Sequence, residues 1–277
     1  MDDATAHVRK VWEDQADSWY AERDMLLAAS RLVHDWLVRH VDPQHGQRVL
    51  EIGAGPGDTG FLVAPLLGPG RLVSTDIAPG MVEAARRRGA ELGIQNVDYR
   101  VLDAQAMDLD DASFDGVVSR WGYMLMPDPL QALRETRRVL KPGGRLAFAV
   151  FTGPAENPWV SIAVSVLGEG GYLPAPSDEW SPGILSLADR GHLQGLVESA
   201  GFASSSLEIV DMAWTFDDAD GYWRFLGDVT ALGPVFRGLT GPARDAVRAA
   251  IDARLAPFTD SGRVVLPAQC WGGLTIR

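Results

Sequence analysis

The sequence has little cysteine, little lysine and no long apolar run. Cys270 is the one cysteine among 277 residues, so no disulfide can form within the chain, and we expect a reducing, cytoplasmic location. The longest apolar runs, such as 146–151, are far shorter than the ~20 residues of a membrane-spanning helix. The acidic start at residues 1–3 lacks the pattern of a secretory signal. We therefore expect no membrane span, and we expect Cys270 to be a buried thiol in a late strand.

A basic surface of the kind that binds nucleic acid is also lacking. The formal charge is −12, from 37 acidic and 25 basic side chains. The densest basic run, Arg86 to Arg88, lies in an expected helix, where a solvated face explains it. We therefore expect no nucleic-acid partner. A homodimer is compatible with the sequence.

What is present is an alternation of short β-rich runs and helical patterns between residues 46 and 152. The expected strands are 48–52, 71–75, 97–102, 114–119 and 144–151, and the expected helices are 58–67, 79–92 and 129–140. Such alternation is typical of a parallel sheet covered by helices. Pro65 predicts that the first of these helices is short or kinked. The glycines at 143 and 144 predict a tight turn into the fifth strand.

The flanking segments differ in texture from this core. Apolar side chains at Val8, Trp12, Ala16 and Trp19 have helical spacing. Further helices are expected at 25–40, 187–200 and within 217–258, with a sixth strand near 207–212 and a last strand or hairpin at 264–276. The predicted parts are an N-terminal helical lid (1–45), a core (46–152), a cap with the sixth strand (153–262) and a final strand (263–277).

The most informative run is Val49 to Asp58. A short apolar strand ends at Glu51 and leads into glycines at positions 53, 55 and 57. Glycine lets a backbone turn sharply and lie against a ligand. Where such a turn joins a strand to a helix, the free N–H groups at the helix start can bind an anionic group. The run therefore predicts a ligand site after the first strand.

Four polar residues stand at the carboxyl ends of four predicted strands: Glu51, Asp76, Asp103 and Ser119. In open parallel sheets, ligands bind beyond these ends, where the strand order reverses. Asp76 follows Gly57 by 19 residues, the distance at which a carboxylate meets a ribose diol. Asp76 is alternatively the N-cap of the next helix, and it can do both.

Together these runs resemble the class I S-adenosylmethionine-dependent methyltransferase family. They are similar in particular to its small-molecule branch, which includes the ubiquinone and menaquinone C-methyltransferases. The resemblance covers roughly residues 45–152, and it is carried by Val49–Gly57, Asp76–Met81, Asp103–Ala106, Phe114-Asp115, Leu140–Leu146 and, later in the chain, Gly201-Phe202. It implies an α/β fold with a doubly wound, mostly parallel, seven-stranded Rossmann-like sheet. It also implies N-terminal helices and a helical insertion that form a lid, and S-adenosyl-L-methionine as cofactor.

The resemblance also implies roles for residues of the first two strand ends. Gly53, Gly55 and Gly57 would pack against the methionine part of the cofactor. Glu51 would hold the loop and the amino group, directly or through water. Asp76 would bind the ribose hydroxyls, while Ile77 and Met81 would cover the adenine.

Residues of the later strand ends receive roles in the same way. Asp103 would accept from the adenine amino group, and the Ala104 N–H would meet a ring nitrogen. Ser119 and Arg120 would reach the methionine carboxylate or line the methyl end. Aromatic rings attract a sulfonium cation, so Trp19, Tyr20, Trp121 and Tyr123 are candidates to close over it. The predicted cofactor-binding set is Tyr20, Glu51, Gly53, Ala54, Gly55, Gly57, Asp76, Ile77, Met81, Asp103, Ala104, Gln105, Ser119, Arg120 and Trp121.

No catalytic residue and no metal site are assigned from the sequence. A sulfonium methyl group is already activated, so a base is needed only where the nucleophile arrives protonated. The five histidines have no compelling partner in the sequence, and we interpret them as structural or solvated; they are His7, His34, His40, His45 and His192.

The region after the fifth strand is expected to bind the methyl acceptor. Enzymes that methylate nucleobase or protein amino groups carry an Asn/Asp-Pro-Pro-aromatic run after strand four, where this chain has residues 119–124; Asn157-Pro158-Trp159 comes after strand five instead. The later segment is rich in aromatic residues, namely Trp159, Tyr172, Trp180, Trp214, Phe216, Tyr222, Trp223, Phe225 and Phe236. They favour an apolar or aromatic small molecule of quinone, polyketide or terpenoid type. They are equally expected to form the core of a helical cap.

Two other functions are known for folds built around a glycine-rich loop of this kind. A nicotinamide-dependent oxidoreductase would have glycine at position 58, where Asp58 stands, and no Tyr-x-x-x-Lys pair exists. A non-catalytic cofactor-binding or partner protein can share the fold. The intact set of glycines and acidic residues favours retained cofactor binding.

Overall fold

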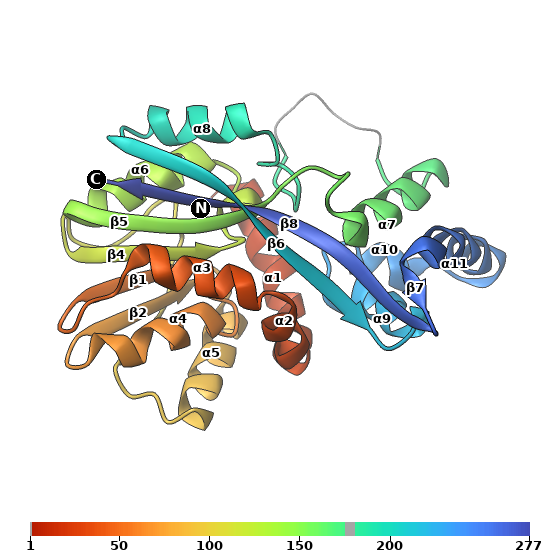
Figure 1. Cartoon of the computed structure of the whole chain (residues 1–277), viewed down its shortest axis with the longest axis horizontal. Coiled ribbons are helices and arrows are strands. Elements are labelled where there is room, and N and C mark those ends of the chain that lie inside the picture. Colours follow the sequence, from red (N-terminus) through yellow and green to blue (C-terminus); the bar gives the residue numbers. More distant parts are fainter. Residues whose placement is uncertain (1, 175–180) are drawn as a thin grey trace.

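The computed structural model describes residues 2–174 and 181–277. A single sheet with strand order β3-β2-β1-β4-β5-β8-β6 forms its core (Figure 1). The first five strands are parallel, and β8 pairs antiparallel with both β5 and β6. The strands are β1 (Arg48–Ile52), β2 (Arg71–Asp76), β3 (Val97–Val101), β4 (Phe114–Arg120), β5 (Leu140–Phe151), β6 (Ser204–Phe216) and β8 (Arg263–Ile276), with a two-residue β7 (Thr259–Asp260) beside β8. The predicted doubly wound, mostly parallel sheet is confirmed.

Helices cover both faces of this sheet. The strand order runs from β1 to β2 and β3 in one direction and from β1 to β4 and β5 in the other, so right-handed crossovers place their helices on opposite faces. One face carries α4 (Asp58–Val63) and α5 (Pro79–Glu91), joined by α3 (Arg31–Val41), which packs on α4 and on β4 and β5. The other carries α6 (Pro129–Val139) and α8 (Arg190–Ser199). The order reverses between β1 and β4, which fixes where a ligand crevice can lie.

Two local expectations meet the structure differently. Helix α4 ends at Val63, and a 3₁₀ helix, η1 (Ala64–Leu67), follows with Pro65 in its first turn, so the predicted shortening is confirmed. Strand β5 begins at Leu140, opposite Phe114, and residues 141–144 form an irregular bend before pairing resumes at Arg145 opposite Gly116. Gly143 has a φ of +79° there, and its N–H donates to the Arg277 carbonyl over 3.0 Å. The predicted turn is therefore present, as a bulge within β5.

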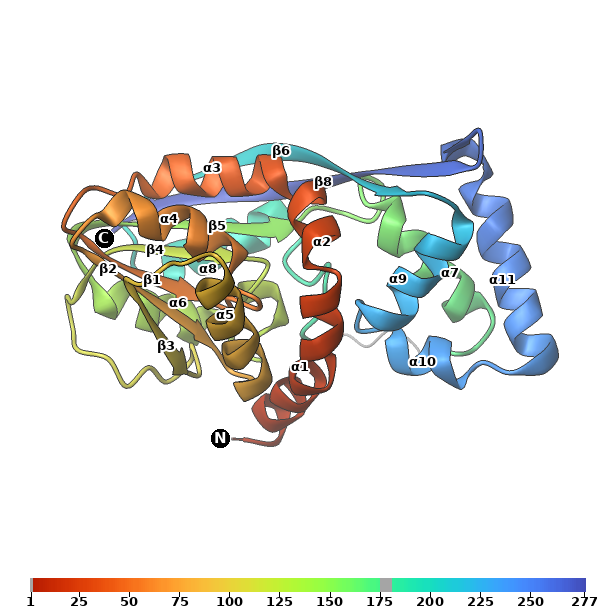
Figure 2. The ribbon, with the colours of Figure 1, turned by 90° about the horizontal axis from the view of Figure 1, so that it is seen from below.

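The N-terminal segment forms α1 (Asp3–Ala21) and α2 (Arg23–Ala29) before α3. Asp2 caps α1, because its carboxylate accepts from the Thr5 N–H over 2.8 Å. Helix α1 packs against α5 and crosses from the sheet toward the cap (Figure 2). It is therefore placed to cover a crevice at the reversal point of the sheet.

His34 joins α3 to the start of α4. It is fully buried, with Nδ1 3.0 Å from Thr59 Oγ1 and Nε2 2.9 Å from Ser30 Oγ. Burial, reinforced by the Arg120 charge, holds the pKa of His34 well below its usual value. A neutral, doubly bonded histidine of this kind is structural, as the sequence suggested.

The cap is carried on a two-stranded ribbon. β5 pairs with β8 only between Cys270 and Ile276, whereas β6 pairs with β8 over its whole length, from Ser204 to Phe216. The outer halves of β6 and β8 therefore project past the sheet and reach the cap helices (Figures 1 and 2). These helices are α7 (Pro158–Glu169), α9 (Ala219–Asp228), α10 (Gly233–Gly238) and α11 (Gly241–Leu255), followed by a short 3₁₀ helix, η3 (Ala256–Phe258).

Two further sequence expectations can be placed. Cys270 is fully buried within β8, as predicted. Across residues 2–174 and 181–277, none of the helices combines the length and the apolar character needed to cross a bilayer. Trp180, one of the aromatic candidates, lies outside the described residues.

Candidate functional site

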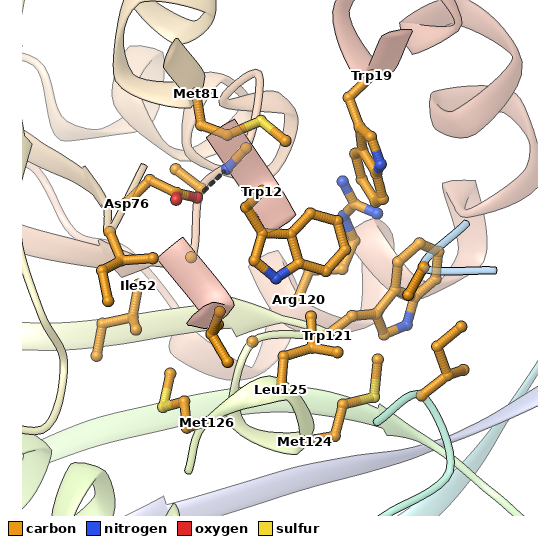
Figure 3. A pocket seen from close by; sticks show the side chains of 18 of the residues that line it. Trp12, Trp19, Ile52, Asp76, Met81, Arg120, Trp121, Met124, Leu125 and Met126 are labelled. Atoms are coloured by element: carbon orange, nitrogen blue, oxygen red, sulfur yellow. Dashed lines mark hydrogen bonds between the residues drawn. The ribbon is translucent and has the colours of Figure 1, made fainter. Parts of the chain in front are cut away.

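A large cavity opens at the point where the strand order reverses. It encloses about 1100 Å³, counting the part open to solvent. Its walls come from the carboxyl ends of β1, β2 and β4, from α1, and from the cap (Figure 3). We call the part beside the β1 and β2 ends the polar half, and the part formed by the rings of Trp121, Phe151, Trp159, Trp214 and Phe225 the ring half. The two halves differ in chemistry and are described in turn.

The glycine loop after β1 forms the floor of the polar half. All three of its glycines have positive φ, and Gly57 reaches +90°. A Cβ atom at Gly57 would lie 2.5 Å from the Phe61 ring, so this position accepts only glycine. The Ala54 N–H donates to the Thr75 carbonyl over 2.9 Å, which ties the loop to β2. Gly53, Ala54 and Gly55 line the cavity, whereas Gly57 lies beneath it at the start of α4.

Glu51 supports this loop from below. Its carboxylate accepts from the Gly60 N–H over 2.7 Å and from Ser74 Oγ over 2.9 Å. Burial is the main reason that the pKa of Glu51 rises to about 7, although both hydrogen bonds and the Arg120 charge oppose the rise. The side chain is 2% exposed and does not line the cavity. Glu51 thus ties the first turn of α4, which follows the loop, to β2.

Asp76 ends β2 and faces the polar half. One carboxylate oxygen accepts from the Gly55 N–H over 3.0 Å, the bond drawn at Asp76 in Figure 3. The other oxygen accepts from the Ala78 N–H, also over 3.0 Å. Burial raises the pKa of Asp76, while these backbone donors lower it. Each oxygen keeps a further lone pair, so the carboxylate can accept two more hydrogen bonds from neighbouring hydroxyls. Asp76 therefore lines the cavity, but it is not the N-cap of α5: that position is Ala78, with no side-chain capping hydrogen bond, so the N-cap interpretation is wrong.

The ends of β2 and β3 complete the polar half. Asp103 accepts at one oxygen from the Gln105 N–H over 2.9 Å, in a tight turn after β3. The Gln105 side chain contacts Thr5 of α1 over 3.3 Å and so helps to hold the lid. Ile77, Met81 and Ala104 also line the cavity, as predicted for the adenine site.

Arg120 lies between the two halves, as the last residue of β4. It is 8% exposed, and its Nη2 lies 3.9 Å from Asp58 Oδ2. Within the described residues, Nε and Nη1 have no hydrogen-bond partner, and neither does Asp58 Oδ2. Burial lowers the pKa of Arg120, an effect opposed by Asp58 and Glu51. A buried cation with unused donors is prepared for an anionic ligand group.

Trp121 adopts a strained conformation next to Arg120. Its φ is +62°, a left-handed value that is rare for a bulky residue and costs about 1–3 kcal/mol. The Trp121 ring stacks on Phe151 with centroids 4.7 Å apart, and its Nε1 donates to Cys270 Sγ over 3.3 Å. These contacts hold the ring at the junction of the two halves. Strain of this kind clusters at ligand sites.

Helix α1 closes the cavity and connects its halves. Trp12 and Trp19 line it, with ring centroids 5.6 Å apart, and Figure 3 shows Trp12 between Asp76 and Trp121. Trp19 Nε1 donates to the Val229 carbonyl of the cap over 2.9 Å. On the other side, the Gly80 N–H of α5 donates to Glu13 over 2.8 Å. Helix α1 is thus fastened to both α5 and the cap.

Two further predicted residues lie outside the cavity. Tyr20 faces away from it, with its hydroxyl on Glu91 and Arg87 over its ring. Ser119 is fully buried and donates to the Ile52 carbonyl over 3.0 Å. Tyr123, a further ring candidate, donates or accepts at Thr136 over 2.7 Å inside the core. The predicted residues that do line the cavity are Gly53, Ala54, Gly55, Asp76, Ile77, Met81, Asp103, Ala104, Gln105, Arg120 and Trp121.

Some cavity residues were not predicted from the sequence. They include Val8, Leu26, Leu102, the run 124–127 after β4, Ile184 and Thr230. Val8 and Trp12 share the helical spacing that also contains Trp19, so that face of α1 was a usable signal. The run 124–127 follows a strand that ends at the reversal point, which was a second signal.

Comparison with known proteins agrees with this geometry. A family model described as "Methyltransferase domain" matches residues 49–144. The ubiquinone/menaquinone biosynthesis C-methyltransferase UbiE of Klebsiella pneumoniae is 32% identical over 171 residues, which are 58% of this chain and 68% of that protein. Aklanonic acid methyltransferase DauC of a Streptomyces species is 39% identical over 113 residues, 40% of this chain and 51% of that protein.

The matches to the curated relatives cover only part of each protein. The chain spans about half to two thirds of the length of the first curated relatives it matches, 51% and 66%. Among solved structures, the YcgJ protein of Bacillus subtilis shares the fold at 20% identity, with a TM-score of 0.59 over 88% of this chain and 98% of that one. The residues matched by the family model, 49–144, run from β1 to the start of β5 and contain the glycine loop, Asp76 and Asp103. The chain belongs to the class I S-adenosylmethionine-dependent methyltransferases, a family whose cofactor is S-adenosyl-L-methionine.

Proposed function

We propose that this protein transfers the methyl group of S-adenosyl-L-methionine to a small apolar or aromatic metabolite. The observation that carries the proposal is the division of one cavity into a polar half and a ring half. A polar, backbone-rich site suits a nucleoside cofactor, and a wall of aromatic rings suits an apolar acceptor. Both halves meet at Arg120 and Trp121.

The polar half fits the cofactor. Asp76 has free lone pairs for the two ribose hydroxyls, and Ile77 and Met81 supply apolar cover for an adenine ring. Asp103 and the backbone of Ala104 supply an acceptor and a donor for the adenine edge. The bare backbone of the glycine loop leaves room for the methionine part.

Arg120 is the residue that we assign to the methionine carboxylate. Its Nε and Nη1 lack partners in the described chain, so each has a hydrogen to donate to an anionic group. A bound carboxylate would give this buried guanidinium a second counter-charge besides Asp58, whose Oδ2 lies 3.9 Å from Nη2. Glu51, Gly57 and Ser119 then act indirectly, by holding the loop and strand ends beneath the ligand.

The main catalytic task of the chain is to align the nucleophile with the methyl group. When bound, the cofactor supplies an activated methyl group, so the protein must bring a nucleophile into line and keep water out. Trp12 and Trp19 on α1 cover the site, and Trp121 separates its halves. Aromatic faces at this junction also attract a sulfonium by about 0.5–2 kcal/mol.

The ring half supports a planar, largely apolar acceptor. Trp159, Trp214 and Phe225 have centroids 4.9–5.9 Å apart, and all three line the cavity. The names of the two relatives are in keeping with this, since one acts in quinone biosynthesis and the other on aklanonic acid. We therefore propose an acceptor of quinone or polyketide type.

Calorimetric titration tests the proposal, with S-adenosylmethionine, S-adenosylhomocysteine and NADH in parallel. We expect micromolar binding of both adenosyl ligands and none of NADH. An acceptor screen of quinones, phenols and polyketides follows, with the mass gain of one methyl group as readout. Binding without any methylated product would favour a non-catalytic protein on this fold, and binding of NADH alone would refute the proposal.

A further inference from the structure

The ring half contains a buried hydrogen-bond donor that has no partner. Trp214, on β6, is 1% exposed, and its Nε1 has no hydrogen-bond partner within the described residues. An unsatisfied buried donor is costly, so native proteins leave few of them and most mark a place where water or a ligand binds. A bound acceptor atom would therefore satisfy the buried Nε1–H of Trp214.

The other tryptophans show how unusual this is. Five of them donate from Nε1 at 2.8–3.3 Å to a protein acceptor: Trp19, Trp36, Trp121, Trp159 and Trp271. The fold thus satisfies its indole donors wherever it buries them elsewhere in the described chain. At Trp214 it does not.

The surroundings of Trp214 explain why the protein itself offers nothing. The rings of Trp121, Trp159 and Phe225 lie around it, with centroids 6.0, 5.1 and 4.9 Å away. The indole nitrogens of Trp121 and Trp159 are donors, already used on Cys270 and Asn157. Trp214 also lines the cavity. The cavity is thus the neighbour from which an acceptor atom can come.

We propose that the Trp214 indole N–H binds an oxygen atom of the methyl acceptor and thereby selects planar ring compounds that carry such an oxygen. A quinone carbonyl, a phenolate or an aryl carboxylate shares this chemistry, because each presents a lone pair in the plane of a ring. The inference rests on the proposed function, since it concerns the acceptor of that reaction. The hydrogen bond would fix how the ring lies between the aromatic walls, so Trp214 is a specificity residue.

A matched pair of probes and a matched pair of variants test this. 2-Naphthamide has an uncharged acceptor oxygen on a two-ring system, and 2-methylnaphthalene has the rings without the oxygen. Trp214→Phe removes the donor and keeps an aromatic ring. Trp159→Phe removes a neighbouring indole N–H that already has a partner. Affinities are measured by equilibrium dialysis, without cofactor.

We expect Trp214→Phe to lower the affinity for 2-naphthamide roughly five- to tenfold, which corresponds to the loss of one hydrogen bond. The affinity for 2-methylnaphthalene should change less than twofold. Trp159→Phe should change the affinities for both probes by the same factor. If Trp214→Phe lowers the affinities for both probes equally, Trp214 contributes only the packing of its ring. If neither affinity falls, its N–H does not bind a ligand in the cavity. Both results overturn the proposal.

The same proteins separate this inference from the proposed function. If S-adenosylhomocysteine fails to bind the native protein, the proposed function fails, whatever the probes do. If it binds and the probes show no selectivity, only the role of Trp214 fails. Should Trp214→Phe not fold, replacement of Trp214 by benzothienylalanine makes the same comparison, because sulfur takes the place of N–H in a ring of the same shape.

Discussion

The polar half and the ring half of the cavity are built in opposite ways. The polar half consists of backbone turns at strand ends, and its carboxylates are fixed by neighbouring N–H groups. The ring half consists of Trp121, directly after β4, and of side chains from β5, α7, β6 and α9, which meet only in the folded chain. A site made of local turns keeps its chemistry while its surroundings vary. A site made of distant side chains can change its shape one residue at a time.

The largest effect is expected from breaking the ring half alone. Phe225→Ala removes a 5%-exposed ring that touches Trp159, Trp214 and Phe216. It should lower the free energy of unfolding by about 3–5 kcal/mol, measured by urea titration. Because the polar half shares no ring with it, affinity for S-adenosylhomocysteine in the folded protein should change less than about twofold. Tyr172→Ala, at an exposed ring of the cap, is the control and should cost under about 0.5 kcal/mol. A tenfold loss of cofactor affinity would show that the halves are coupled.

The converse change breaks the polar half. Asp76→Ala should weaken S-adenosylmethionine binding roughly ten- to a hundredfold, because a charged acceptor of two hydroxyls is lost. Calorimetry measures this, and affinity for 2-naphthamide should stay unchanged. Asp108→Ala removes the same charge from an exposed position nearby and should leave both affinities as they are. Unchanged cofactor binding in Asp76→Ala would remove that residue from the site.

A pH titration sharpens the comparison, since the buried carboxylate of Glu51 lies next to the polar half without lining it. Its pKa rises from an ordinary value of 4.5 to about 7. Between these values the folded protein keeps a proton that the unfolded chain has released, so its stability falls as pH rises from about 4.5 to about 7. Glu51→Gln should remove this fall. The stability of the variant relative to the native protein should therefore rise across that interval, by on the order of 2 kcal/mol, in urea titrations at pH 5, 6, 7 and 8. A difference that stays constant with pH would contradict the burial of a titrating group.

The smallest effect is expected at Tyr20, next to the lid residue that does line the cavity. Tyr20→Phe removes a hydroxyl bonded to Glu91 at the surface, so S-adenosylmethionine affinity should change less than about twofold. Trp19→Phe is the matched change on the cavity side, and it breaks the bond to the Val229 carbonyl. A larger loss in Tyr20→Phe than in Trp19→Phe would reverse the orientation of α1 described above.

The contrast between the halves also explains what the sequence could predict. Asp76 and Asp103 were predicted because each comes at the end of an expected strand, and Asp76 also follows Gly57 by 19 residues; both signals are local. Tyr20 and Trp19 are neighbours on one helix, about 100° apart around its axis, and no local signal says which of them faces a cavity. Glu51 belongs to a strand that is buried on both faces, so its alternation could not show that it points beneath the loop.

For the ring half, the sequence predicted a segment rich in aromatic residues but not which of them line the cavity. The aromatic richness after β5 was visible, but Phe216 and Phe236 carry the same signal as Trp214 and Phe225 without lining the cavity. Which rings meet is decided by the register of β6 on β8, where Trp214 pairs with Leu266. The start of β5 at Leu140 has a similar cause, since its partner is Phe114 of β4 and the neighbouring Gly143 N–H donates to Arg277, at the other end of the chain.

The long ribbon that carries the cap makes the protein divisible. Phe216 and Val264 are opposite each other in the antiparallel pair, which puts their Cα atoms about 4.5–5.5 Å apart. Everything between them, from α9 to β7, is therefore inserted between two adjacent ends and could be exchanged for a short hairpin turn or for the corresponding segment of a relative. Such an exchange would leave the glycine loop, Asp76 and Asp103 untouched. Exchange of this segment could thus alter the range of acceptors, while the methyl-donor site stays the same.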